Sequence, residues 1–147
     1  MAGVGDRKRD GTVRLERVPW WDVDHIWSTA EIWIEAAFAG RSIVWTTDDI
    51  RGFLTGRVMD LWLAMDGDEP MACAVTRIDR FPRASVCVIL AAGGHDMKAW
   101  LGLQPDLVRW AKAQGCDALE TPGRKGWERV LADKGWSPVW TIYRKEL

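Results

Sequence analysis

The chain has 147 residues and a mass of 16.7 kDa, which is enough for one domain with a single hydrophobic core. Apolar residues make up 48% and charged residues 28%, values that exclude global disorder. The formal net charge is −1, so the chain lacks the basic excess that would indicate binding to nucleic acid. No stretch approaches the roughly 20 apolar residues of a membrane span. The polar first residues carry no apolar signal segment, which predicts synthesis in the cytoplasm.

Residues 1–11 are expected to form a polar, basic tail ahead of a single domain spanning residues 12–147. The tail contains the cluster Arg7, Lys8 and Arg9 and lacks any apolar periodicity. A solvated tail is the ordinary interpretation of so short a charge run. A contact with a partner is the alternative.

The first half of the domain is predicted to begin with a strand at residues 13–18, which Pro19 ends. A helix with a clear 3.6-residue apolar stripe follows, from a cap at Asp22 or Asp24 to Phe38 or Ala39. A second, short helix is then expected, and Thr46 or Thr47 can provide its cap.

The apolar period then changes to two. Three strands are predicted at residues 59–65, 71–78 and 84–92, joined by a turn at 66–69 and a loop at 81–83. They form an antiparallel meander. The third strand is apolar almost throughout and is therefore expected to be central.

The second half is predicted to alternate helices and strands. Its main helix starts near Gln104, because Pro105 is tolerated only in a first turn. A strand at 116–121, a helix at 125–133 and a last strand at 139–145 follow. The strand–helix–strand unit in the middle is expected to be parallel and right-handed.

This order resembles the fold of the GCN5-related N-acetyltransferases (GNAT). The most specific stretch is 110–120, WAKAQGCDALE, which resembles the family's third helix and fifth strand. The stretch 123–136 is similar to the fourth helix and the Gly-Trp step of divergent GNAT-like proteins encoded by tailed bacteriophages. The resemblance implies an α+β fold, with a central mixed, mostly antiparallel sheet flanked by helices. Only 11 residues follow Trp136, so the last strand hairpin is expected to be shortened.

The resemblance also implies that acetyl-CoA would bind where the fourth and fifth strands part, with its pyrophosphate on an R/Q-x-x-G-x-G/A loop. Counting back along the third helix places the Arg/Gln position near His95 and the two Gly positions near Lys98 and Trp100. Trp100 would fill the space that a glycine keeps open. Gly93 and Gly94 are then the relic of a degenerate loop. On this basis we expect no cofactor.

Catalytic residues implied by the resemblance are few. Glu120, on a strand that would face the opening, is the best candidate for a general base, and an ordinary solvated carboxylate is the competing interpretation. Weaker candidates are Asp117, His95 and His25. The position of the tyrosine that many members use as an acid holds Leu131, and Tyr143, the sole tyrosine, lies in the last predicted strand.

The cysteines and histidines predict neither a disulfide framework nor a metal site. The three cysteines, Cys73, Cys87 and Cys116, are expected to be small buried thiols. Only two histidines could join them, and no zinc-site spacing is present.

The 11 tryptophans are more than a domain of this size easily buries, so some are expected to face a partner. Trp20 and Trp21 form a paired aromatic outcrop after Pro19. They either staple onto the first helix or, with the Arg7–Arg9 cluster, form a partner-binding patch. Arg124 either bonds carbonyls where the sheet opens or is a surface charge.

Two hypotheses follow. The sequence favours a non-catalytic GNAT-fold structural or docking protein of a tailed-phage particle, made in the bacterial cytoplasm and located in the virion. Its partners would be other phage structural proteins, without nucleic acid or membrane. The alternative is a cytoplasmic, acetyl-CoA-dependent N-acyltransferase with an atypical cofactor loop. The degenerate loop and the surplus tryptophans favour the first.

Overall fold

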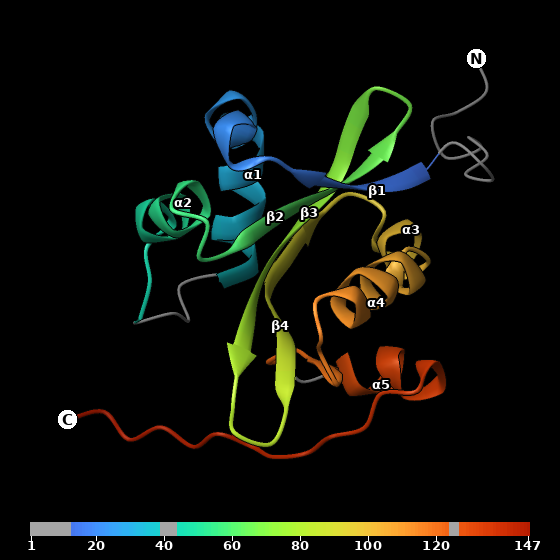
Figure 1. The fold of residues 1–147 in the computed structure, drawn as a ribbon. Helices are drawn as coiled ribbons and strands as arrows, with labels where there is room; N and C mark the ends of the chain where they lie inside the picture. Colours follow the sequence, from blue (N-terminus) through green and yellow to red (C-terminus); the bar gives the residue numbers. More distant parts are fainter. Residues whose placement is uncertain (1–12, 39–43, 124–126) are drawn as a thin grey trace.

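The computed structural model describes residues 13–38, 44–123 and 127–147 (Figure 1). The expected N-terminal tail with Arg7, Lys8 and Arg9, and also Arg124, lie outside the described residues.

A five-stranded sheet in the order β1-β2-β3-β4-β5 forms the centre of the molecule. The first four strands are antiparallel neighbours, and β5 pairs in parallel with β4. The predicted meander and the predicted parallel unit are thereby confirmed. The strands are β1 (Val13–Val18), β2 (Asp60–Asp66), β3 (Glu69–Arg80), β4 (Ser85–Gly94) and β5 (Ala118–Glu120).

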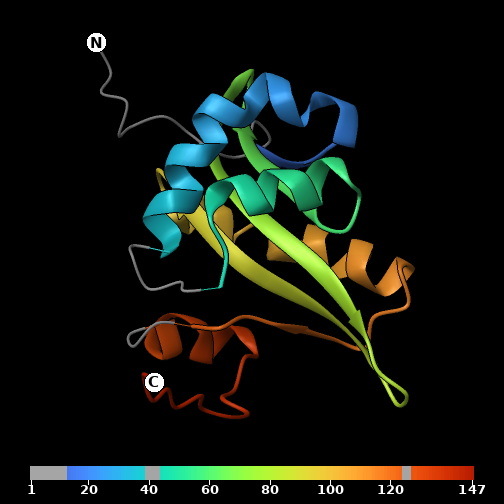
Figure 2. The same cartoon turned by 90° about the vertical axis from the view of Figure 1, so that its left-hand side faces the viewer.

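Two helices cover one face of the sheet (Figure 2). They are α1 (Val23–Phe38), preceded by a single 3-10 turn at Trp20–Asp22, and α2 (Thr47–Thr55). The apolar stripe of α1 packs on β3 and β4 and forms a core with β2. Thr46 is the cap of α2: its hydroxyl accepts from the Asp49 amide at 3.2 Å, and the Asp49 carboxylate accepts from the Thr46 amide at 2.9 Å.

The other face carries α3 (Met97–Leu101), α4 (Gln104–Ala113) and α5 (Trp127–Leu131), and α5 continues into a 3-10 turn at Ala132–Lys134 (Figure 1). Pro105 stands in the first turn of α4, as expected, because its missing N–H has no partner to lose there. The core under these helices consists of Trp62, Ala64, Ala72, Ala74, Ile89, Trp100 and Leu107.

The C-terminal segment differs from the prediction. The last strand expected at residues 139–145 is wrong: after a turn at Gly135, residues 136–147 have no strand pairing, and every residue from Ser137 on is exposed. A strand needs a neighbour that completes its hydrogen bonds, and the described part of the chain places none beside this segment. The strand expected at 116–121 is also shorter, because β5 pairs over three residues only.

The predicted fold class is confirmed: a mixed, mostly antiparallel sheet is flanked by helices. In place of the shortened final hairpin that the sequence predicts, residues 136–147 form no strand. Within the described ranges, no helix has the length and apolar character that crossing a membrane requires.

Candidate functional site

The strands β4 and β5 part at a bulge in β4. In the pairing with β3, Thr76 faces Ile89 and the neighbouring Val75 faces Ala91. Leu90 therefore has no partner on β3 and is an extra residue on β4. Such an insertion bends a strand and increases its twist. On the β5 side the last paired residues are Val88 and Glu120, and the next contact is the Thr121 hydroxyl donating to the Ile89 carbonyl at 3.0 Å. Beyond Ile89 the two strands therefore diverge.

A cavity of about 280 Å³ lies in the opening. One wall is the last part of β4 and the end of α1, and the opposite wall is the segment after β5 together with α5 and α3. The described residues that line it carry no charged side chain: they are Ala36, Ala37, Ile89 to Gly94, Trp100, Leu101, Gln104, Thr121 to Gly123, Trp127, Leu131 and Trp136. The site is thus an apolar pocket with a few polar groups, the usual character of a small-molecule site.

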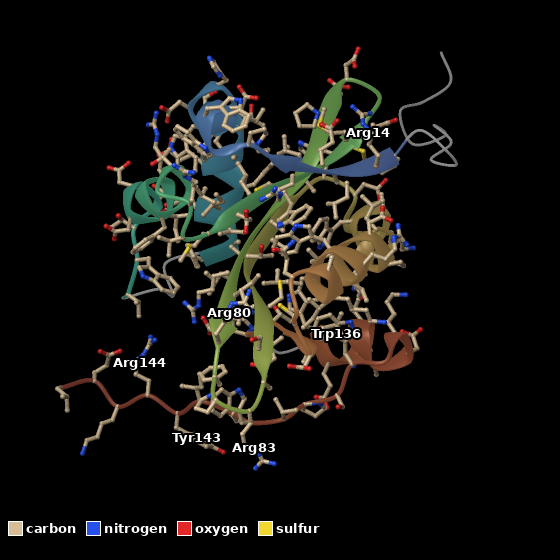
Figure 3. The ribbon with its side chains drawn as sticks, in the orientation of Figure 1. Arg14, Arg80, Arg83, Trp136, Tyr143 and Arg144 are labelled. Atoms are coloured by element: carbon tan, nitrogen blue, oxygen red, sulfur yellow. The ribbon has the colours of Figure 1, made fainter. Side chains whose placement is uncertain are left out.

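Trp136, labelled in Figure 3, is one of the residues that line this cavity. Its indole N–H donates to the Gln104 side-chain oxygen at 2.9 Å, which ties the segment after α5 to the first turn of α4. Leu131 lies in the same wall and is buried. The wall is therefore fixed by packing and by one hydrogen bond between groups that are far apart in sequence.

Gly93 and Gly94 lie inside β4, where close packing requires them. A Cβ on Gly93 would lie 2.7 Å from the Trp33 carbonyl oxygen, so α1 rests directly on the strand. Gly94 has φ +137°, and a Cβ there would lie 2.4 Å from the Cα of Ala72. These glycines hold α1 and β3 against the end of β4, whereas the sequence suggested a relic of a phosphate loop.

Only His95 and Asp96 connect β4 to α3, which leaves little room for a glycine-rich loop. Asp96 has φ +52°, and its carboxylate accepts from the Ala99 amide at 3.3 Å, so a side chain of the protein caps α3. Lys98 is exposed on α3. Trp100 is only 5% exposed and packs in the core as well as lining the cavity. The R/Q-x-x-G-x-G/A pattern has no counterpart in this connection.

The described residues therefore fit one part of acetyl-CoA and not the other. The opening between β4 and β5 suits a neutral, extended arm, because it is lined by apolar groups and by the β4 backbone beyond the last β5 pair. The α3 N-terminus does not suit a pyrophosphate, because an aspartate caps it and the adjoining glycines are used for packing.

Glu120 is the final paired residue of β5 and directly precedes the cavity residue Thr121. It is half-buried, and within the described ranges its carboxylate has no hydrogen-bond or ion-pair partner. Residues paired across strands share a face, so Glu120 lies on the face of Val88 and Arg77, where Arg77 stacks on Trp45 at 5.4 Å. This is the face that α1 and α2 cover.

The other three candidates for a base occupy different places. His95 follows the cavity residue Gly94, and its ring contacts Trp33 edge-on at 5.8 Å. Asp117 lies at the far end of β5, where it accepts from the Ser85 amide at 3.0 Å. His25 is exposed near the start of α1, 3.3 Å from Asp22. Only Glu120 and His95 therefore adjoin the cavity.

A tyrosine acid is absent from the described walls of the cavity. Leu131 occupies the corresponding position, and Tyr143 is 90% exposed in the C-terminal segment, away from α5 (Figure 3).

Trp20 and Trp21 lie at the opposite end of α1 from the cavity, roughly 22 Å away along the helix axis. Their rings meet edge-to-face at 5.7 Å, and Arg57 stacks over Trp20 at 4.9 Å. Trp21 is 62% exposed, so the pair is an outcrop that α1 only partly covers.

None of the three cysteines is among the described residues that line the cavity. Cys73 and Cys87 are buried, as predicted, and burial raises the pKa of each thiol to about 12. Cys116 is only partly buried. No group of three His, Cys, Asp or Glu side chains within residues 13–38, 44–123 and 127–147 is arranged to hold a metal ion.

No family model matches the sequence, and no curated protein matches it either. Solved structures do resemble the fold. An aminoglycoside acetyltransferase from an uncultured soil metagenomic sample, in complex with sisomicin, has a TM-score of 0.70 and 10% identity, over 95% of this chain and 100% of that one. The aminoglycoside N-acetyltransferase AAC(6')-Iy in complex with CoA has a TM-score of 0.65 and 15% identity, over 96% and 99%. A probable acetyltransferase has a TM-score of 0.67 and 10% identity, over 91% and 97%.

These likenesses establish a GNAT-like fold and correct the preferred sequence hypothesis. The comparisons contradict the preferred hypothesis of a non-catalytic structural or docking protein, because similar structures include aminoglycoside acetyltransferases, one of them in complex with CoA. They also give no support to a phage particle as its location or to phage subunits as its partners. The expectation of no cofactor is likewise unsupported.

Proposed function

We propose that the protein is an N-acyltransferase that moves a short acyl group from a thioester to an amine. The carrying observation is the opening between β4 and β5 at the Leu90 bulge, with a cavity whose described lining carries no charged side chain. The donor's arm would run along the β4 backbone between Leu90 and Gly94. The likeness in fold to an acetyltransferase in complex with CoA supports a thioester of the CoA kind as the donor.

The reaction asks little of the protein beyond positioning and one proton transfer. The acceptor must reach the thioester as a free amine, so its ammonium first gives a proton to a base. Glu120 is our candidate because it is half-buried beside the opening. The amine nitrogen then forms a bond to the carbonyl carbon, the carbon–sulfur bond breaks, and the departing thiolate takes a proton from water.

The test is release of free thiol from acetyl-CoA in the presence of amines of three kinds: the aminoglycoside sisomicin, a polyamine and a lysine peptide. We expect turnover with at least one of them. Glu120→Gln should lower kcat/KM by about 10²- to 10⁴-fold. Glu128→Gln, on the exposed side of α5, is the matched control and should leave the rate unchanged.

Filling the cavity provides a second arm of the test. Ala92 lines the opening and is only half-buried, so Ala92→Leu should be tolerated by the fold while it narrows the path of the arm. We expect loss of donor binding with an unchanged circular dichroism spectrum. Absence of acetyl transfer to every amine, together with absence of thioester binding, would contradict the proposal.

A further inference from the structure

The two halves of a CoA thioester would meet different surroundings at this opening. We propose that the protein recognises its acyl donor through the neutral pantetheine arm alone, so that the nucleotide half of CoA adds no affinity. The inference rests on the N-acyltransferase function proposed above. The chemical class of the donor is then an acylated pantetheine arm, free or attached as phosphopantetheine to a carrier protein.

The cavity matches such an arm in polarity. A pantetheine arm is uncharged and carries two amides and a thioester among apolar carbons. The described lining offers the same mixture: the β4 backbone from Leu90 to Gly94, the side chains of Gln104 and Thr121, and otherwise apolar surface. Buried amides need hydrogen-bond partners, which a strand edge supplies and a wholly apolar cavity does not.

The end of β4 is unfavourable for a diphosphate. Asp96 places a carboxylate at the N-terminus of α3, and that carboxylate accepts from the Ala99 amide. A phosphate there would meet a negative charge and would lose an amide donor. The helix has only five residues, so its dipole offers little compensation. Lys98 is exposed, and an exposed ion pair contributes little.

The backbone also cannot open toward an anion at this point. Glycines in a phosphate loop let phosphate oxygens approach the main chain, but here the Cβ side of Gly93 faces the Trp33 carbonyl and that of Gly94 faces Ala72. Trp100, one helical turn after the cap residue Asp96, is buried in the core. At Gly93, Gly94 and Trp100, the described chain is thus already packed against other parts of the protein.

Calorimetric titration of the full chain tests the inference with three probes: pantetheine, CoA and adenosine 3′,5′-bisphosphate. We expect pantetheine and CoA to bind with dissociation constants within about threefold of each other, and no saturable binding of the bisphosphate. CoA binding more than about 30-fold tighter than pantetheine, or saturable binding of the bisphosphate, would overturn the inference. Acetyl transfer that requires CoA would leave the proposed function standing. Binding of neither pantetheine nor CoA would overturn both.

A charge variant tests the role of Asp96 directly. Asp96→Asn keeps an acceptor for the Ala99 amide and removes the charge. It should therefore raise the affinity for CoA, relative to the affinity for pantetheine, by about fivefold or more. Asp106→Asn, in the first turn of α4 beside Arg109, is the control and should change the affinity for neither ligand. An unchanged ratio in Asp96→Asn would refute the role given to this carboxylate.

The source of the arm is decided by comparing acetyl-pantetheine with an acetylated holo carrier protein as donors at equal concentration. Faster transfer from the carrier protein identifies a protein-bound arm, and equal or slower transfer identifies a small-molecule thioester. Both results support recognition of the arm. Transfer from acetyl-CoA alone would contradict it.

Discussion

Gly93 and Gly94 show that glycines in similar sequences can have different structural roles. A pair of glycines before a helix is typical of phosphate loops, and the sequence was interpreted in that way. The structure uses both to bring α1 and β3 into backbone contact with β4. Sequence alone could not distinguish these uses, because the difference lies in which distant backbone approaches the glycine.

Gly94→Ala should destabilise the fold by more than about 2 kcal/mol, because the new Cβ would overlap Ala72 and the left-handed φ is unfavourable for alanine. Gly52→Ala is the matched control: Gly52 lies within α2 with open space around it, so alanine should stabilise the protein by about 0.5–1 kcal/mol. Urea denaturation measures both. Equal effects of the two substitutions would contradict the packing described for β4.

The buried thiols predict a pattern of reactivity. Burial raises the pKa of Cys73 and Cys87 to about 12, so both remain protonated and shielded in the native state at pH 8. A thiol reagent should label Cys116 first and reach the other two only in denaturant. Rapid native labelling of all three would show that the core around β3 and β4 is open.

The same thiols make stability depend on pH. Between the usual thiol pKa near 8.5 and about 12, the unfolded chain loses these protons and the folded chain keeps them. The free energy of unfolding should therefore fall as pH rises through this window, by about 1.4 kcal/mol per unit for each thiol. A Cys73→Ala/Cys87→Ala variant should show a shallower decline, measured by urea denaturation at several pH values.

At the scale of elements, local chemistry made most of the fold predictable. Four predicted features each depend on a few neighbouring residues: the strand at 13–18, the apolar stripe of α1, the cap of α2 and the first turn of α4. The Leu90 bulge and the missing strand at 139–145 depend instead on partners far away in the chain. The resemblance implied an opening between the fourth and fifth strands with Glu120 beside it. The bulge that produces the cavity, and the residues that line it, could not be predicted from local sequence.

The capping box of α2 gives a prediction at this scale. Thr46→Ala removes the acceptor for the Asp49 amide and should lower the free energy of unfolding by about 1 kcal/mol. Thr47→Ala, one residue later, removes only a longer contact to Glu31 at 3.4 Å and should cost less. Thermal melts of both variants decide between the two threonines, and a larger loss in Thr47→Ala would contradict the assignment of the cap.

At the scale of the whole molecule, the C-terminal segment is a surface feature. Five of its residues are large, apolar and exposed: Val139, Trp140, Ile142, Tyr143 and Leu147. Removing residues 138–147 should therefore change the melting temperature by less than about 3 °C, since little apolar area is uncovered. Trp136 remains and keeps the wall of the cavity. A drop of more than about 8 °C would show that the segment packs on the domain.

The unequal pairing of β4 on its two sides has a consequence for motion. It joins β3 through nine residue pairs but β5 through three. Local opening follows the weakest contacts, so β5 should separate from the sheet at a smaller free energy than global unfolding requires. We expect the amides of Ala118–Glu120 to exchange with deuterium faster than those of β3 and β4, as native-state exchange can measure. Such excursions would widen the slot beside Leu90 and let a long chain slide in sideways, without any hinge or lid.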